Sequence, residues 1–274
     1  MQPVEPIIVV DLFEPLLDRL LLLLRQLSAV EWQRPTPCEG WSVKDIALHL
    51  LGDEMGQLSR GRDKDTSYSL KPGPDLVSRI NEHNALWVEA TRRISTPLLC
   101  ELLDSTGHEV VKYFKSRPLM EMGGPVSWAG PEPAPIWLDV AREYTERWHH
   151  QQHIREALQQ PGLTEAAFLT PVLDTFMRAL PYTFRAIEAP EHTVIQLSIT
   201  GEAGRSWFLM RNHSAWSLFT DTAFEPAAII TIDQQTTWCL LTKGLTREQA
   251  LARASTQGNT ALALPFFSAV SIIA

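Results

Sequence analysis

Apolar residues recur at helical spacing through most of the first 160 positions. The pattern predicts helices over residues 11–27, from Ser42 onward, and over residues 76–94, 97–117 and 136–160. Asp11 is the expected N-cap of the first helix, and Ser42 with Asp45 has the spacing of a capping box at the start of the second. We expect a break at Gly107 within the fourth. This part of the chain is therefore predicted to be a bundle of about four main helices.

The pattern changes after residue 161. Thr164–Phe184 is still helical in spacing, but short runs with β-type alternation follow, over residues 192–200, 207–210, 215–219 and 228–232. These predict three or four strands in hairpin order, followed by helical stretches over residues 236–241, 246–254 and 261–273. We predict an α+β protein of two domains, with a helical bundle over residues 1–163 and a small α+β domain over residues 164–274.

The long helix predicted over residues 136–160 carries three of the eight histidines. At about 100° per residue, Glu146, His150 and His153 return to the same face. A carboxylate and an imidazole one turn apart can reach one cation, so Glu146 and His150 form a candidate half-site for a metal ion. The alternative is a solvated face that only stabilises the helix through pairs four residues apart.

A second element has to decide between these interpretations. His149 falls outside the face, in a row of polar residues that we expect to be solvated. His49, on the predicted second helix, borders an apolar stripe one turn before Asp53. Such a histidine is commonly a satisfied core residue, but a metal ion is held tightly only when ligands come from separate elements, and His49 would supply the second one.

Composition narrows the classes of function. The 274 residues are 45% hydrophobic with a net charge of −8, which indicates a globular protein and argues against nucleic-acid binding. Three widely spaced cysteines suggest neither a disulfide framework nor a zinc knuckle. No signal peptide is evident, and the leucine run at residues 20–24 is far shorter than the roughly 20 residues of a membrane span. We expect a cytoplasmic protein without a membrane or nucleic-acid partner.

Two segments together resemble a known family. Residues 32–54, which include the sequence PTPCEGWSVKD and His49, and residues 146–155 are similar to the N-terminal metal-binding domain of the mycothiol-dependent maleylpyruvate isomerase family, a branch of the DinB-like four-helix bundles. Residues 233–244 and 258–263 are similar to the sterol-carrier-like α+β domain that accompanies these bundles. The resemblance implies this two-domain fold for nearly the whole chain.

The resemblance also implies a ligand set. In the family, a histidine on the second helix and a Glu-x-x-x-His pair on the last helix hold a divalent metal, and these positions fall on His49, Glu146 and His150. Family members commonly have Asp where this chain has His153, so His153 is either a partner that orients a ligand or itself a ligand. Two imidazoles and one carboxylate suit Zn²⁺ and leave one coordination position open.

An open metal position implies catalysis. The family uses it to activate a low-molecular-weight thiol such as mycothiol, so we expect a thiol-dependent isomerase or S-transferase that acts on a small electrophile. Arg205 and Arg211 are candidates for contacts to the carboxylates or sugars of the thiol, in a cleft between the two domains. Cys38 lies in the loop before the second predicted helix and could approach the site. A buried or incidental thiol is the simpler interpretation.

Two other classes of function stay open. A metal-dependent hydrolase would have water in the open position and would act without added thiol. A non-catalytic protein would bind an apolar ligand in the C-terminal domain and retain only a vestigial metal site. The sequence leaves the substrate, the thiol, the native metal and the choice between monomer and dimer undetermined.

Overall fold

The computed structural model describes residues 2–272, and their contacts group them into two compact units. The first, which we call the helical unit, contains residues 9–118 and 143–163. The second, the sheet unit, contains residues 2–8, 119–142 and 164–272. The predicted α+β fold of two domains is confirmed, because one unit is helical and the other is built on a five-stranded sheet. Every helix within residues 2–272 is too short or too polar to cross a bilayer.

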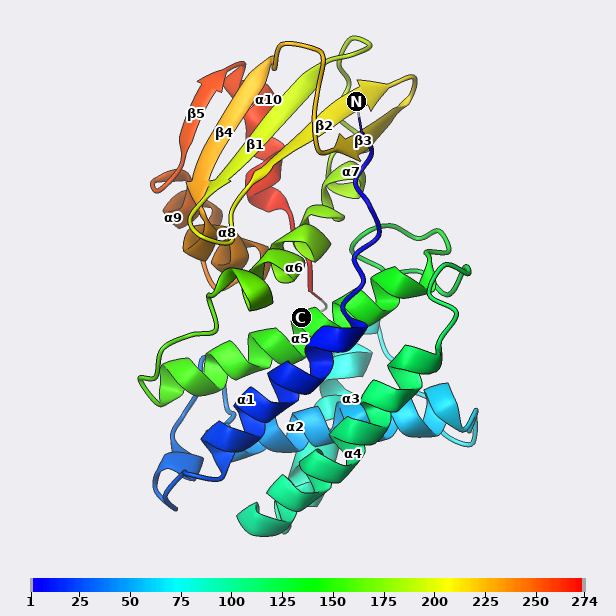
Figure 1. Ribbon diagram of the computed structural model, residues 1–274, viewed down its shortest axis with the longest axis vertical. Helices are drawn as coiled ribbons and strands as arrows, with labels where there is room; N and C mark the ends of the chain where they lie inside the picture. Colours follow the sequence, from blue (N-terminus) through cyan, green and yellow to red (C-terminus); the bar gives the residue numbers. More distant parts are fainter. Residues whose placement is uncertain (1, 273–274) are drawn as a thin grey trace. The chain divides into compact units, whose positions relative to one another are not determined.

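The helical unit is built from four helices and part of a fifth (Figure 1). These are α1 (Phe13–Leu24), α2 (Val43–Gly56), α3 (Leu76–Thr91), α4 (Thr96–Ser116) and the part of α5 (Ile136–Ala157) that starts at Glu143. Short helical turns cover Val10–Leu12 (η1), Glu31–Gln33 (η2) and Gln57–Arg62 (η3). The prediction that Asp11 caps α1 is wrong: Asp11 lies inside η1, and the N-cap position falls on Leu12, without a side-chain cap.

The predicted break at Gly107 is also wrong. Helix α4 runs through Gly107 without interruption, and a Cβ at this position would lie 2.7 Å from Leu17 Cδ2 on α1. Glycine is therefore present because α1 and α4 pack closely there, which is a packing reason for glycine inside a helix rather than a signal for its end.

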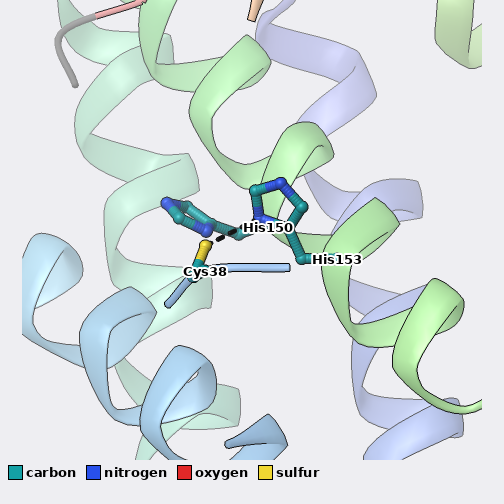
Figure 2. Close-up of side chains that lie close together, drawn as sticks. All are labelled: Cys38, His150 and His153. Carbon is teal, nitrogen blue, oxygen red and sulfur yellow. Dashed lines mark hydrogen bonds between the residues drawn. The ribbon is translucent and has the colours of Figure 1, made fainter. Parts of the chain in front are cut away.

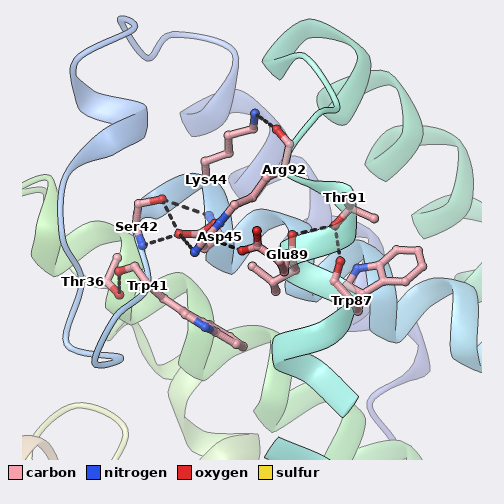
Figure 3. A network of polar contacts seen from close by, with 10 residues as sticks. Thr36, Trp41, Ser42, Lys44, Asp45, Trp87, Glu89, Thr91 and Arg92 are labelled. Atoms are coloured by element: carbon pink, nitrogen blue, oxygen red, sulfur yellow. Dashed lines mark hydrogen bonds and ion pairs between the residues drawn. The ribbon is translucent and has the colours of Figure 1, made fainter. Parts of the chain in front are cut away.

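Helix α2 is fixed at its start and along its length (Figure 3). The capping box is confirmed: Ser42 Oγ accepts from the amide of Asp45, and Asp45 Oδ2 accepts from the amide of Ser42. Arg92, just after α3, donates to both carboxylate oxygens of Asp45. Trp87 Nε1 donates to the carbonyl of Leu48 at 2.7 Å. These contacts hold the turn of α2 that carries His49.

The sheet unit contains five strands in the order β3-β2-β1-β4-β5 (Figure 1). Their bounds are β1 (Val194–Thr200), β2 (Ser206–Asn212), β3 (Ala215–Phe219), β4 (Ala228–Asp233) and β5 (Ser255–Gly258). The first three follow the predicted hairpin order, but β4 pairs parallel to β1, which corrects that expectation. Strand β5 was missed because Ser-Thr-Gln-Gly offers no apolar alternation and is mostly exposed.

Short helices accompany this sheet. They are α6 (Ala166–Met177), α7 (Leu180–Thr183), α8 (Gln234–Leu241), α9 (Arg247–Leu251), α10 (Thr260–Ala263) and the 3₁₀ turn η4 (Leu264–Ser268). Alternate residues of β1 and β4 are buried, as expected for strands with one covered face. The helix predicted over residues 261–273 ends earlier, and its described part consists of α10 and η4.

Candidate metal centre

Three donor groups from two helices converge inside the helical unit. His49 comes from α2, and Glu146 and His150 come from α5. Glu146 Oε1 lies 3.3 Å from His49 Nε2 and 3.0 Å from His150 Nε2. One donor atom from each residue lies within 4.8 Å of the other two. The structure thus brings together the three residues predicted as ligands, and we call them the His-Glu-His set.

These side chains are not on a solvated face. His49 is 3% exposed and His150 is 9% exposed, so the interpretation of a merely solvated helix surface is wrong for this part of α5. The row expected to be solvated is buried as well, since His149 is 6% exposed and Thr145 and Gln152 are also inside. Residue type alone predicts that the polar side chains of α5 are solvated, but the fold covers this helix on several sides.

The electrostatics of the set favour a cation. Burial opposes ionisation of Glu146, but the adjacent His150 and His49 imidazoles hold the pKa of this carboxyl well below its usual range. Burial also disfavours charge on His49, yet Asp53 and then Glu146 raise the pKa of this imidazole to about 9. Both Nε2 atoms face the same carboxylate oxygen, an arrangement of two nitrogens and one oxygen that fits a divalent ion.

Asp53 is a fourth group that sequence analysis noted without assigning a role. Its Oδ2 lies 3.4 Å from His49 Nε2, because residues four apart on α2 share a face. Burial is the main reason that its pKa is raised, and the carboxylates of Glu146 and Glu143 add to that effect. Asp53 is therefore a carboxyl group beside the His-Glu-His set that takes up a proton more readily than an exposed aspartate.

A buried ion pair lies next to the site on α5. Arg147 Nη1 donates to Glu143 Oε2 at 2.7 Å, and both side chains are almost fully buried. Glu54, on α2, is buried and accepts from Thr106 Oγ1 on α4. Burial raises the pKa of Glu54 to about 8, although the positive charge of Arg147 opposes the rise. The interior of the helical unit thus contains further ionisable groups besides the His-Glu-His set.

The loop before α2 covers His49. Thr36 holds this loop closed, with its amide and its hydroxyl both donating to the carbonyl of Trp41. The Trp41 ring lies 5.1 Å from the His49 ring, measured between centroids. Trp41 also lines an open pocket of about 600 Å³, together with Lys44, Asp45 and other residues of this region. The loop thus positions an aromatic side chain against a predicted ligand.

Cys38 and His153 lie together at the same site. Cys38 Sγ is 3.1 Å from His153 Nδ1, and these two residues with His150 form a second group of potential ligands (Figure 2). Burial, and secondarily Glu146, raises the pKa of the Cys38 thiol to about 11. Burial lowers the pKa of His153 to about 2, so this imidazole is neutral. The sequence predicts that Cys38 lies in a loop near the site, but it does not indicate how that loop folds onto α5.

Arg205 and Arg211 lie in the sheet unit and make contacts there. Arg205 Nη2 donates to Asp174 Oδ1, and its guanidinium lies 5.1 Å from the centroid of the Trp207 ring. Arg211 Nη1 donates to the carbonyl of Ser214 at 2.9 Å. These contacts account for both side chains as parts of the sheet unit. Their role in binding a thiol stays a prediction.

Comparisons with known proteins agree with this fold. The family model of the mycothiol maleylpyruvate isomerase N-terminal domain matches residues 13–155. A crystal structure of the mycothiol-dependent maleylpyruvate isomerase has a TM-score of 0.50 at 10% identity, and a single-residue mutant of that enzyme has 0.49 at 10%. Each alignment covers 84% of this chain and 86% of the other. At this identity the structural likeness concerns the fold alone. No curated protein matches the sequence.

Proposed function

Since the chain belongs to the mycothiol maleylpyruvate isomerase N-terminal domain family, we propose that it is a metal-dependent enzyme that uses a low-molecular-weight thiol of the mycothiol type. The reaction is an isomerisation or an S-transfer on a small electrophilic substrate. The observation that carries the proposal is the convergence of His49, Glu146 and His150, with the two imidazoles 3.3 Å and 3.0 Å from one carboxylate oxygen.

In this proposal the His-Glu-His set holds a divalent ion, and Zn²⁺ suits its donors best. Such an ion lowers the pKa of a thiol that binds to it and so supplies a nucleophile at neutral pH. Glu146 contributes the negative charge, because its pKa is held well below the usual range. The burial of His49 and His150 keeps bulk water away from the donors, which strengthens every electrostatic interaction there.

Asp53 takes part in proton transfer in this proposal. A thiol that ionises at the site must lose its proton to a nearby base, and Asp53 Oδ2 lies 3.4 Å from His49 Nε2 without belonging to the His-Glu-His set. The pKa of Asp53 is raised, chiefly by burial, which brings it closer to the pH at which the enzyme works. Arg147 and Glu143 form an ion pair one turn apart that stabilises this part of α5 as a helix.

The test is a thiol-dependent assay with matched variants. Purified protein is stripped with a chelator, reloaded with Zn²⁺ and offered mycothiol with a panel of electrophiles that includes maleylpyruvate. We expect turnover that requires both metal and thiol, that is lost in Glu146→Ala, and that persists in His108→Ala. His108 is the matched control because it pairs with Asp104 four residues earlier on an exposed face of α4. Turnover without thiol would indicate a hydrolase, and no turnover with any electrophile would contradict the proposal.

A further inference from the structure

Cys38, His150 and His153 form a second cluster of donors beside the His-Glu-His set. The sulfur of Cys38 lies 3.1 Å from His153 Nδ1, and Figure 2 shows it beside the rings of both histidines. One donor atom from each of the three residues lies within 4.8 Å of the other two. Cys38 comes from the loop before α2, whereas both histidines come from α5, so separate elements meet here.

His150 has one ring nitrogen for each cluster. Its Nε2 interacts with Glu146 Oε1 at 3.0 Å, which assigns this nitrogen to the His-Glu-His set. Its Nδ1 is buried and has no hydrogen-bond partner among residues 2–272. A buried ring nitrogen without a partner is costly and needs an explanation, and coordination to a cation would supply one. Because Nε2 is already used, Nδ1 is the nitrogen left for the cluster with Cys38 and His153.

The loop holds Cys38 in position. The amide of Trp41 donates to the carbonyl of Cys38 at 3.0 Å, and the carbonyl of Trp41 accepts from the amide of Thr36 at 3.0 Å. The sulfur is thus presented to α5 by a fixed backbone rather than by a mobile chain end. If Cys38 only filled space or only formed a hydrogen bond with His153, nothing would require His150 Nδ1 to lie nearby without a partner.

We propose that Cys38, His150 and His153 form a second cation position, joined to the His-Glu-His set through the imidazole of His150. One sulfur and two nitrogens are the donors of a soft or borderline ion, so the position would take Zn²⁺, Co²⁺ or Cd²⁺ rather than Mg²⁺ or Ca²⁺. When both positions are filled, the second ion forms bonds to the Cys38 sulfur and to His150 Nδ1. Two protons are then released to solvent, one from the thiol and one from the imidazole, which becomes an imidazolate that bridges the two ions. The second position shares His150 with the metal site of the proposed function, and the inference rests on that function in this respect alone.

The experiment uses Co²⁺ as the probe, because a thiolate ligand gives Co²⁺ an ultraviolet charge-transfer band that nitrogen and oxygen ligands do not give. The full-length metal-free protein is titrated with Co²⁺, and the bound ions are counted by elemental analysis. We expect about two ions per chain in the wild type and about one in Cys38→Ser, which would also lose the band. In Glu146→Ala we expect about one ion with the band retained. Cys239→Ser, a partly buried cysteine of the sheet unit, is the control and should match the wild type.

Three other results would overturn the second position, and they differ in what they say of the first. One ion per chain, with the band lost in both Cys38→Ser and Glu146→Ala, would make Cys38 a ligand of a single site. One ion without any thiolate band would leave the His-Glu-His set intact and remove the second position. No bound Co²⁺ in a wild type that is folded by circular dichroism would contradict both positions and the proposed function with them.

Discussion

The two units differ in what they bury. The buried polar side chains of the helical unit include seven that can carry a charge, which are Asp45, His49, Glu54, Glu143, Arg147, His149 and His150. In the described part of the sheet unit, Asp174 is the one ionisable side chain in the buried class. Asp174 has partners, since both Arg205 and the Trp207 indole donate to its Oδ1. The sheet unit therefore follows the ordinary rule that a buried charge is paired.

The helical unit buries more such groups and brings several of them together. Arg147 pairs with Glu143, and His49 and His150 share one carboxylate oxygen of Glu146. Burying ionisable groups costs stability, and a protein retains the cost where the groups serve chemistry. This contrast supports the proposal that the chemistry of this chain lies in the helical unit. In the sheet unit, Arg205 and Asp174 form a charged pair.

The largest effect that would sharpen this contrast is the pH dependence of metal binding. Metal must displace the proton of His49, whose pKa Asp53 and Glu146 raise to about 9 against the effect of burial. Affinity for Zn²⁺ should therefore rise about tenfold per pH unit below pH 9, or about 100-fold from pH 7 to pH 9, and level off above. Competition with a chelator of known affinity, in the Cys38→Ser background, measures it.

Asp53→Asn provides the control for that prediction. Because Asp53 is the strongest of the groups that raise the pKa of His49, its removal should bring the plateau to a lower pH. An affinity that does not change between pH 7 and pH 9 in the wild type would mean that no histidine proton competes with the metal.

The next effect concerns stability. Burial raises the pKa of Glu54 to about 8, above its unfolded value, so the folded state holds the proton more tightly and loses stability as pH rises toward 8. The slope reaches about 1.4 kcal/mol per pH unit for one group. Glu54→Gln, which resembles the protonated form, should flatten this part of the profile, so that it stabilises the protein by about 2 kcal/mol more at pH 8 than at pH 6. Urea unfolding at pH 6, 7 and 8 measures the slope, and an unchanged slope in the variant would be the contrary result.

The smallest effect tests the sheet unit. Asp174→Ala would leave the Trp207 indole without its acceptor, and Arg205 is partly exposed, so we expect a loss of about 1–3 kcal/mol in the free energy of unfolding. Zinc affinity should be unchanged, because every residue of both donor clusters lies in the helical unit. A variant that unfolds less readily than the wild type, or that loses zinc while still folded, would contradict the division of roles.

Local rules predicted the parts of the site that depend on one helix. The spacing of Glu146 and His150, and the capping box of Ser42 and Asp45, depend only on helical geometry, and the structure has both as predicted. The placement of His49 against α5 needed a second helix, and the family resemblance supplied it.

Tertiary packing decided what the sequence did not show. Glycine is a poor helix former, which predicts a break at Gly107, but the close approach of Leu17 requires glycine there. The polarity of His149 predicts a solvated side chain, but the fold buries it. The contact between Cys38 and His153 joins residues 115 positions apart, and no local pattern encodes such a contact.

The most direct test of the central claim is zinc affinity in a background with one metal position. In Cys38→Ser, we would measure the dissociation constant for Zn²⁺ by chelator competition with and without His49→Ala. Loss of an orienting partner of a ligand alone weakens metal binding about 10- to 100-fold, so loss of His49 should weaken it by at least about 100-fold. The exposed control His108→Ala should leave the constant unchanged. Equal affinity with and without the His49 imidazole, or an equal loss in His108→Ala, would contradict a metal centre at His49, Glu146 and His150.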